Sequence, residues 1–173
     1  MPKAIVKRLR GGDRRSIGAA NELASAAGGN RARFRGLVEA MWHRDEVIRM
    51  RAADAAEKAS REHPELLAPY KPELLGLLRE ATQQELRWHL APMIARLDLT
   101  RVERADAVSI LKTYLDDRSS IVRTFAMQAL ADIADDDLRP EVLDLIRVLT
   151  KTGSAAMRAR GRKLLKKLEK ERG

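Results

Sequence analysis

The sequence contains no cysteine, and this absence excludes several kinds of chemistry. There can be no disulfide bond, no thiolate nucleophile and no zinc site built on cysteine. A chain without cysteine fits a reducing compartment, so we expect a cytoplasmic location. The first ten residues carry four basic side chains and no long apolar run, and they do not resemble a signal peptide.

Aromatic residues are scarce as well, at 3% of the 173 residues. A core made mainly of Leu, Ala, Val, Ile and Met is one that stacked helices allow. Hydrophobic residues make up 45% of the chain and charged residues 34%, which favours a folded protein over a disordered one. No stretch approaches the roughly 20 apolar residues of a membrane span, so no membrane association is expected.

Recognisable catalytic and metal-binding motifs are missing. The three histidines, His43, His63 and His89, do not have the spacing of metal ligands. The sequence contains neither a Gly-x-Ser-x-Gly motif nor a phosphate-binding loop of the Gly-Lys-Ser/Thr type. We therefore predict no catalytic residue, no metal site, no cofactor and no enzymatic activity.

A repeated unit organises what the chain does contain. In its clearest copy, from Leu115 to Ile133, Val122 and Arg123 are followed by small and apolar residues at helical spacing. Similar arrangements recur, with successive arginines 34, 38, 36 and 35 residues apart. The aligned arginines are Arg15, Arg49, Arg87, Arg123 and Arg158. A period of a few tens of residues indicates a solenoid.

The pattern from Asp117 through Val122-Arg123 to Leu130 resembles the second helix of a HEAT repeat, and residues 64–78 resemble the first. The resemblance covers roughly residues 30 to 170. It implies an all-α fold, a right-handed α-solenoid of about five HEAT-like helix pairs in a single domain, residues 1–173. The predicted units are a degenerate first repeat at 1–29 and helix pairs at 30–62, 64–97, 101–134 and 138–171.

Capping residues and prolines predict where some helices begin or break. Asp13 is a plausible N-cap for a helix over residues 14–27, and Asp137 for the helix that follows it. Pro69 and Pro72 lie inside an apolar helical pattern, which they should kink or break.

The net charge of +9 is concentrated at the two ends of the sequence. Residues 1–35 and residues 151–173 each carry nine basic and two acidic side chains, whereas the segment between them has a net charge of −5. This distribution permits two interpretations of the basic residues. They are structural and solubilising, or they contact phosphates. The candidate nucleic-acid contacts are Arg15, Arg49, Arg87, Arg123, Arg158, Arg162, Lys163, Lys166 and Lys167.

Trp88 is the most distinctive aromatic residue. It lies two positions after Leu86, about 200° round a helix, and so points away from the apolar stripe of its helix. It packs against the adjacent repeat or is exposed in a groove. The candidate partner groove consists of Trp88, His89, Phe125 and Gln128.

The leading hypothesis is a monomeric, non-catalytic binding or scaffold module whose concave face holds a protein or peptide. The alternative is a nucleic-acid-binding protein.

A weaker resemblance concerns the alkylpurine DNA glycosylases built from HEAT-like repeats, which are also small, basic, cysteine-poor and all-α. It implies a concave cleft with tryptophans and a carboxylate beside the lesion. Trp88 matches loosely, but Pro92 occupies the position four residues on, where a carboxylate would help. An apolar groove at Trp88 and Phe125 favours a protein ligand, a continuous positive groove favours nucleic acid, and a buried, unpaired carboxylate near a tryptophan favours the enzyme.

Overall fold

The computed structural model describes residues 3–11 and 15–170, and in these ranges it contains ten α-helices, two 3₁₀ helices and no strand. The all-α prediction is confirmed. The chain divides into two compact units, Met1–Asp98 and Leu99–Gly173, which we call the first and second units. The division falls between the predicted helix pairs 64–97 and 101–134, and a single solenoid domain stays a prediction. Among the described residues, no helix has the length and apolar character needed to cross a membrane.

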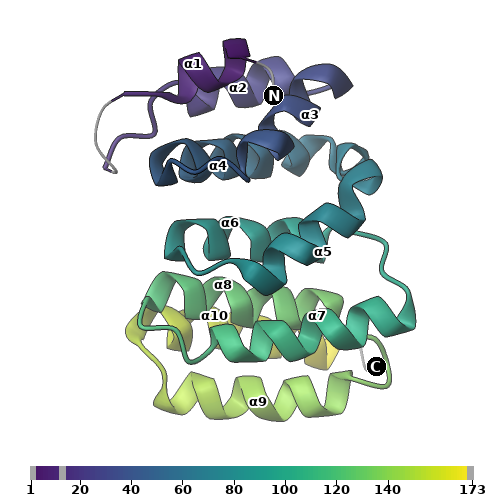
Figure 1. The fold of residues 1–173 in the computed structure, drawn as a ribbon. Coiled ribbons are helices and arrows are strands. Elements are labelled where there is room, and N and C mark those ends of the chain that lie inside the picture. The colour runs from purple at the N-terminus through teal and green to yellow at the C-terminus, as the bar shows by residue number, and fades with distance from the viewer. Residues whose placement is uncertain (1–2, 12–14, 171–173) are drawn as a thin grey trace. The chain divides into compact units, whose positions relative to one another are not determined.

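The first unit is built around α4 (Glu46–Glu62), which contacts helices on several sides. Figure 1 shows α4 with α1, α2 and α3 on one side and α5 and α6 on the other. The bounds of these other elements are α1 (Lys3–Leu9), α2 (Ala20–Ala27), α3 (Arg31–Ala40), η1 (Pro64–Leu66), η2 (Ala68–Tyr70), α5 (Lys71–Glu80) and α6 (Gln84–Ala95).

Local sequence explains why α4 begins where it does and how it packs. The side chain of Asp45 accepts a hydrogen bond from the backbone N–H of Val47 and caps the helix. Five alanines between residues 52 and 59 are buried, and their small side chains let neighbouring helices approach closely. Because α4 is covered on most of its surface, four of its polar side chains are buried as well: Arg51, Asp54, Glu57 and Ser60.

The predicted proline break is confirmed. In place of one long helix, residues 64–70 form η1 and η2, and α5 begins only at Lys71. Pro72 falls in the first turn of α5, where its missing N–H leaves no helical hydrogen bond unmade.

The starts of two helices differ from the sequence predictions. The helix expected over residues 14–27 is shorter, because α2 begins at Ala20, and Asp13 lies outside the described residues. The prediction of Asp137 as an N-cap is wrong. Asp135 accepts the hydrogen bond from the backbone N–H of Leu138, so the turn is fixed two residues earlier.

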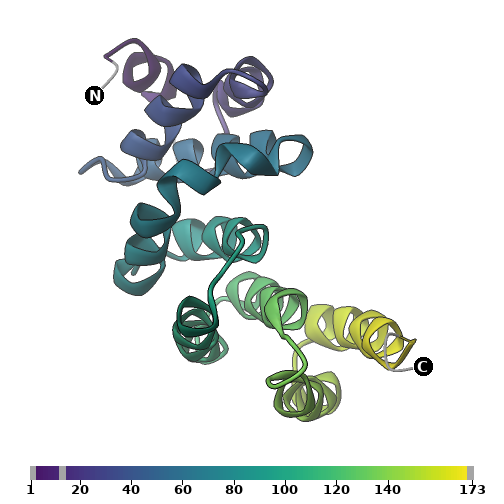
Figure 2. The same ribbon diagram turned by 90° about the vertical axis from the view of Figure 1, so that its right-hand side faces the viewer.

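The second unit consists of α7 (Arg101–Tyr114), α8 (Ser120–Ile133), α9 (Arg139–Thr152) and α10 (Ala155–Lys170). Figure 2 looks nearly along these helices, and α8 lies with α7 on one side and α10 on the other. Thr100 and Glu103 form a capping box at the start of α7, and Ser119 caps α8.

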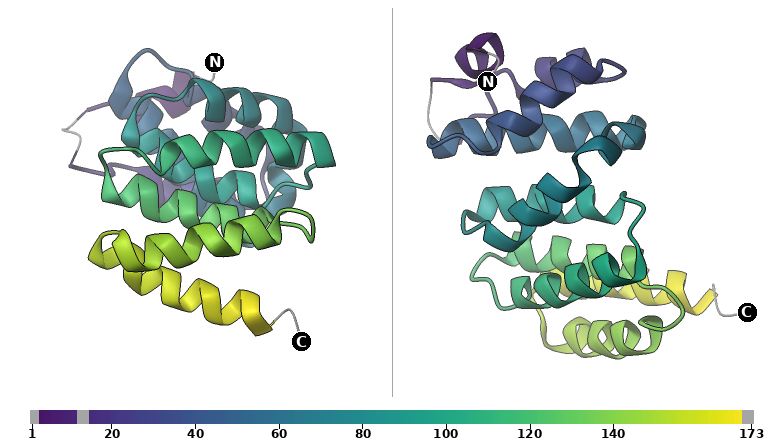
Figure 3. Two further views of the ribbon diagram at one scale, coloured as in Figure 1. Left: turned by 90° about the horizontal axis from the view of Figure 1, so that it is seen from below. Right: turned by 45° about the vertical axis from the view of Figure 1, so that its right-hand side comes forward.

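Close packing of α10 against α9 depends on Gly161. The two helices run side by side in Figure 3. A Cβ atom at Gly161 would lie 2.0 Å from Oγ1 and 3.0 Å from Cβ of Thr150. Thr150 is β-branched and its hydroxyl donates to the carbonyl of Ile146, so its side chain has little freedom to move away.

We therefore expect Gly161→Ala to lower the free energy of unfolding, by about 1 to 3 kcal/mol, because the added methyl group overpacks the contact. Chemical denaturation followed by circular dichroism measures this. The control is Gly76→Ala in α5, where nothing lies within 4 Å of the added atom. That change should stabilise the helix by about 0.5 to 1 kcal/mol. Equal effects at the two glycines would contradict the packing argument.

Candidate functional site

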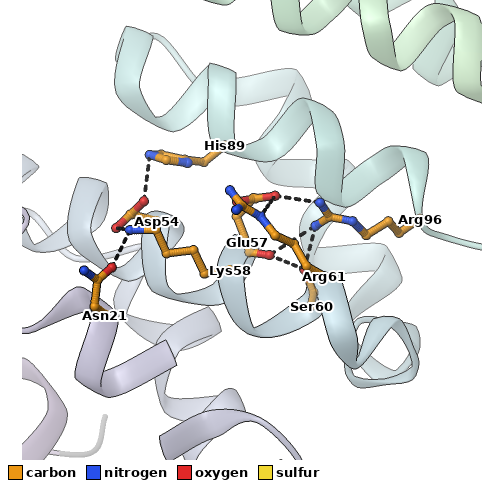
Figure 4. A network of polar contacts seen from close by, with 8 residues as sticks. All are labelled: Asn21, Asp54, Glu57, Lys58, Ser60, Arg61, His89 and Arg96. Carbon is orange, nitrogen blue, oxygen red and sulfur yellow. Dashed lines mark hydrogen bonds and ion pairs between the residues drawn. The ribbon is translucent and has the colours of Figure 1, made fainter. Parts of the chain in front are cut away.

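Charged side chains fill part of the interior of the first unit (Figure 4). Glu57 of α4 is only 4% exposed. Arg96, just after α6, donates to Glu57 Oε1 over 2.6 Å, to the Glu57 carbonyl over 3.1 Å and to Ser60 Oγ over 2.9 Å. Arg61 approaches the same carboxylate from the next turn of α4, with its NH2 group 2.6 Å from Oε2. Glu57 thereby joins α4 to the end of α6.

The protonation of Glu57 follows from this arrangement. Burial by itself would raise the pKa of the carboxyl, because it disfavours the charged form. Hydrogen bonds from Arg61 and Arg96 favour the charged form, and together with the two positive charges they hold the pKa of Glu57 below its ordinary value. The carboxylate is therefore ionised and fully engaged at neutral pH.

A second polar cluster lies one turn earlier on α4. Lys58 donates to Asp54 Oδ2 over 2.7 Å and to Oδ1 of Asn21, in α2, over 2.6 Å. His89 of α6 lies on the other side, with its Nε2 atom 3.8 Å from Asp54 Oδ1. Burial lowers the pKa of His89 below its ordinary value, although the charge of Asp54 opposes this. The hydrogen bonds of Lys58 join α2 to α4, whereas His89 lies beside Asp54 beyond hydrogen-bond distance.

Arg51 binds described residues of the segment that precedes α2. Its side chain is fully buried and donates to the backbone carbonyls of Leu9, Gly11 and Ser16. Gly18 has a positive φ of 52°, and a Cβ atom there would lie 3.1 Å from the guanidinium carbon of Arg51. Glycine at this position therefore lets the loop close over the arginine.

A cleft beside Trp88 opens next to these clusters. It has a volume of about 220 Å³ and is lined by residues 15 and 17, which precede α2, and by residues of α4 and α6. They are Arg15, Ile17, Met50, Arg51, Asp54, Glu85, Trp88 and His89. The rings of Trp88 and His89 meet edge to face at 5.7 Å. We call this hollow the Trp88 cleft.

The Trp88 cleft combines partly exposed apolar surface with charges that are already engaged. Trp88 is half-buried, and Ile17 is 45% exposed although it is a large apolar residue. Asp54 is bound by Lys58, and Glu85 lies 3.5 Å from the amide nitrogen of Gln84. The cleft can thus receive an apolar or aromatic group, and the carboxylate of Asp54 beside it is held by Lys58 through Oδ2.

Within the described residues, no group of three or more His, Asp or Glu side chains could hold a metal ion. Other hollows lie in the first unit. One, of about 440 Å³, lies between α2 and α4 and includes Lys58 and His63. Another, of about 360 Å³, is lined mainly by apolar residues of α1, α2 and α3. A further one, of about 240 Å³, is lined by residues of the turn after α3, α4, α5 and α6, and it includes Trp42 and Arg49.

The four predicted groove residues fall in different units. Trp88 and His89 are brought together in the Trp88 cleft of the first unit. Phe125 and Gln128 belong to α8 of the second unit, and both are half-buried. The side chain of Gln128 donates to Asp132 over 2.9 Å and accepts from Arg160 over 2.8 Å, so it already links α8 to α10.

Two of the repeat-spaced arginines bind backbone carbonyls at the turn that precedes their helix. Arg49 donates to the carbonyl of His43 over 3.0 Å, and Arg87 to that of Ala81 over 2.8 Å. In both cases the acceptor lies six residues earlier. Arg49 also donates to the side chain of Gln83 over 3.1 Å. These contacts match the structural interpretation of the repeat arginines.

The remaining candidate nucleic-acid contacts lie in different settings. Arg15 is exposed at the rim of the Trp88 cleft. Arg123 is half-buried on α8, and its Nε atom has no hydrogen-bond partner among the described residues. The others are exposed on α10: Arg158, Arg162, Lys163, Lys166 and Lys167. The repeat arginines therefore differ in exposure and in what they bind.

Sequence reasoning missed the residues that build the interior of the first unit, namely Arg51, Glu57 and Arg96. One signal was available. Asp54 and Lys58, and likewise Glu57 and Arg61, are opposite charges four residues apart and so share a helix face. That such pairs lie inside the unit, with Arg96 and His89 beside them, depends on contacts between helices and has no local signal.

Comparisons with known proteins assign no family to the chain. No model of a protein family matches it, and no curated protein sequence matches it. Among solved structures, the crystal structure of an engineered protein aligns with 97% of this chain and 96% of its own length, at 17% sequence identity and a TM-score of 0.42. A similarity this low does not support a fold or family assignment, so the HEAT-repeat assignment stays a prediction.

Replacing Glu57 with glutamine should lower the free energy of unfolding near neutral pH by about 1 to 3 kcal/mol, because two arginines lose a buried charged acceptor. The pKa of Glu57 is lowered in the folded state, so the unfolded chain takes up the proton first as the pH falls. The stabilisation by Glu57 is complete above its ordinary pKa of 4.5 and is lost below it.

Chemical denaturation at a series of pH values tests this expectation. The difference between the original chain and Glu57→Gln should shrink as the pH falls below about 4.5. The matched control is Glu62→Gln, on the exposed side of the same helix, which should have little effect at any pH. A difference that did not depend on pH would contradict the assignment.

Proposed function

We propose that this chain is a non-catalytic binding module that holds a protein or peptide partner. The observation that carries the proposal is the Trp88 cleft, in which a half-buried tryptophan and a partly exposed isoleucine, Ile17, face a small hollow. Aromatic side chains in pockets of this kind often anchor a partner, since they contribute a large contact area at low entropic cost.

A rigid setting supports the same proposal. Arg51 donates to the carbonyl of Ser16, next to Ile17, and Asp54 connects α4 with α2 through Lys58. A cleft held in this way loses little conformational freedom when a partner side chain enters, and preorganisation of this kind favours affinity. We propose that the partner inserts an apolar or aromatic side chain beside Trp88.

The wider architecture belongs to the proposal as well. We propose that the helix pairs form a right-handed α-solenoid of about five HEAT-like repeats and that the chain acts as a monomer in the cytoplasm. The repeat-spaced arginines support this, because Arg49 and Arg87 make the same carbonyl contact six residues back. A solenoid presents equivalent positions in rows, which suits the binding of an extended peptide.

The glycosylase-like alternative requires a carboxylate that is free to act beside the tryptophan. The Trp88 cleft has two buried carboxylates, and both have partners. Asp54 is bound to Lys58 over 2.7 Å, and Glu85 lies 3.5 Å from the amide nitrogen of Gln84. The binding hypothesis needs no free carboxylate, and the geometry therefore favours it.

Peptides selected from a random displayed library against the full chain should bind in the micromolar range, and Trp88→Ala should weaken that binding by about tenfold or more. Fluorescence anisotropy of labelled peptides measures the affinity. Trp42→Phe gives a chain in which Trp88 is the single tryptophan, and its emission should shift when the peptide binds.

The control for the substitution is Trp42→Ala. Trp42 is 44% exposed in the turn after α3 and does not line the Trp88 cleft, so its removal should leave peptide affinity unchanged. Circular dichroism of each variant shows whether its helices are kept. The proposal would be contradicted if Trp88→Ala and Trp42→Ala lost binding equally. It would also be contradicted if the selection produced no peptide that binds.

A further inference from the structure

The basic residues of α10 fall into two sets that differ in their surroundings. The helix packs on α8 and α9 through its buried residues, which are Met157, Gly161, Leu164 and Leu168. On the flank toward α8, Arg160 donates to Gln128 over 2.8 Å and Lys167 lies 3.4 Å from Asp132. The charged side chains on this flank therefore bind partners within the second unit.

The opposite side of the helix has no such partners. With 3.6 residues per turn, four basic residues lie on the side farthest from the buried stripe, and all four are exposed. They are Arg162, Lys163, Lys166 and Lys170, and we call them the outer face of α10. Among the described residues, no hydrogen bond or ion pair engages any of these four side chains.

One acidic residue borders this face. Glu169 lines the same shallow hollow as Arg162, Lys166 and Lys170, and its Oε1 atom lies 3.7 Å from Arg147 of α9. The outer face therefore carries four positive charges along the helix, with one negative charge at its edge. From Arg162 to Lys170 it extends over about 12 Å, at a rise of about 1.5 Å per residue.

We propose that the outer face of α10 binds the phosphate backbone of duplex DNA. A duplex carries about one negative charge per 1.7 Å along its axis, so a line of this length faces several phosphates at once. The B-form major groove is about 12 Å wide and accommodates an α-helix, whereas the major groove of duplex RNA is deep and narrow.

The composition of α10 argues against other anionic partners. Single-stranded nucleic acid is usually held by aromatic side chains that stack on bases, and α10 has no aromatic residue. Helices that lie in a membrane surface insert an apolar face, but Leu164 and Leu168 are buried in the second unit. Protein partners are usually anchored by aromatic side chains or by arginine in well-packed pockets, whereas the hollow at the outer face is open, has no aromatic residue and is lined mainly by charged side chains, with half-buried Leu165 between them.

This inference goes beyond the proposed peptide binding and does not depend on it. The Trp88 cleft belongs to the first unit and the outer face of α10 to the second. Trp88→Ala tests only the first proposal, and the substitutions below test only the second.

The experiment measures binding of the full chain to a labelled random DNA duplex across a salt series. Binding should weaken with salt, with a log–log slope between about −3 and −4, as expected for three or four phosphate contacts. Lys163→Ala combined with Lys166→Ala should reduce the size of that slope by about two and weaken binding by about tenfold or more. Lys163→Arg combined with Lys166→Arg should keep the binding.

The matched control is Arg160→Ala combined with Lys151→Ala, which removes the same charge from the second unit but from outside the outer face. It should leave the slope unchanged. Equal loss in the two double variants would overturn the proposal, because net charge and not the outer face would then decide binding. The absence of duplex binding at about 50 mM salt would also overturn the proposal. The same holds if poly-glutamate, anionic vesicles or single-stranded DNA bind as tightly as the duplex does.

Discussion

The stability of the first unit depends on the pairing of the charged side chains inside it. A helix that is covered on most sides must satisfy its polar side chains with neighbouring helices, because an unpaired buried charge is strongly destabilising. α4 does this at Glu57, whose carboxylate receives Arg61 from its own helix and Arg96 from the end of α6. If either arginine were removed, the buried carboxylate of Glu57 would keep only one of its two arginine partners.

The candidate binding cleft is a consequence of the same packing. Asp54 and Arg51 connect α4 to α2 and to the loop before it, and the Trp88 side chain completes the wall from α6. The polar groups of this wall are engaged in holding it together. The accessible part of the cleft includes the apolar side chains of Trp88 and Ile17 and the exposed side chain of Arg15.

α4 and α10 show how position changes the meaning of a basic residue. Lys58 on α4 and Lys166 on α10 have the same chemistry and lie on helices of similar length. The first is bound to Asp54 and Asn21, whereas the second faces outward with no partner among the described residues. The total charge of the chain therefore says less about its partners than the location of the charges that are not neutralised.

The sequence alone determined the all-α fold, the approximate bounds of most helices and the break at Pro69 and Pro72, because periodicity, caps and prolines act over a few residues. It also singled out Trp88 and the basic last helix. Only the tertiary structure decided that Arg51 is buried, that Glu57 lies between two arginines, and that the predicted groove residues lie in two units. These features arise from contacts between segments up to about forty residues apart, which no local pattern specifies.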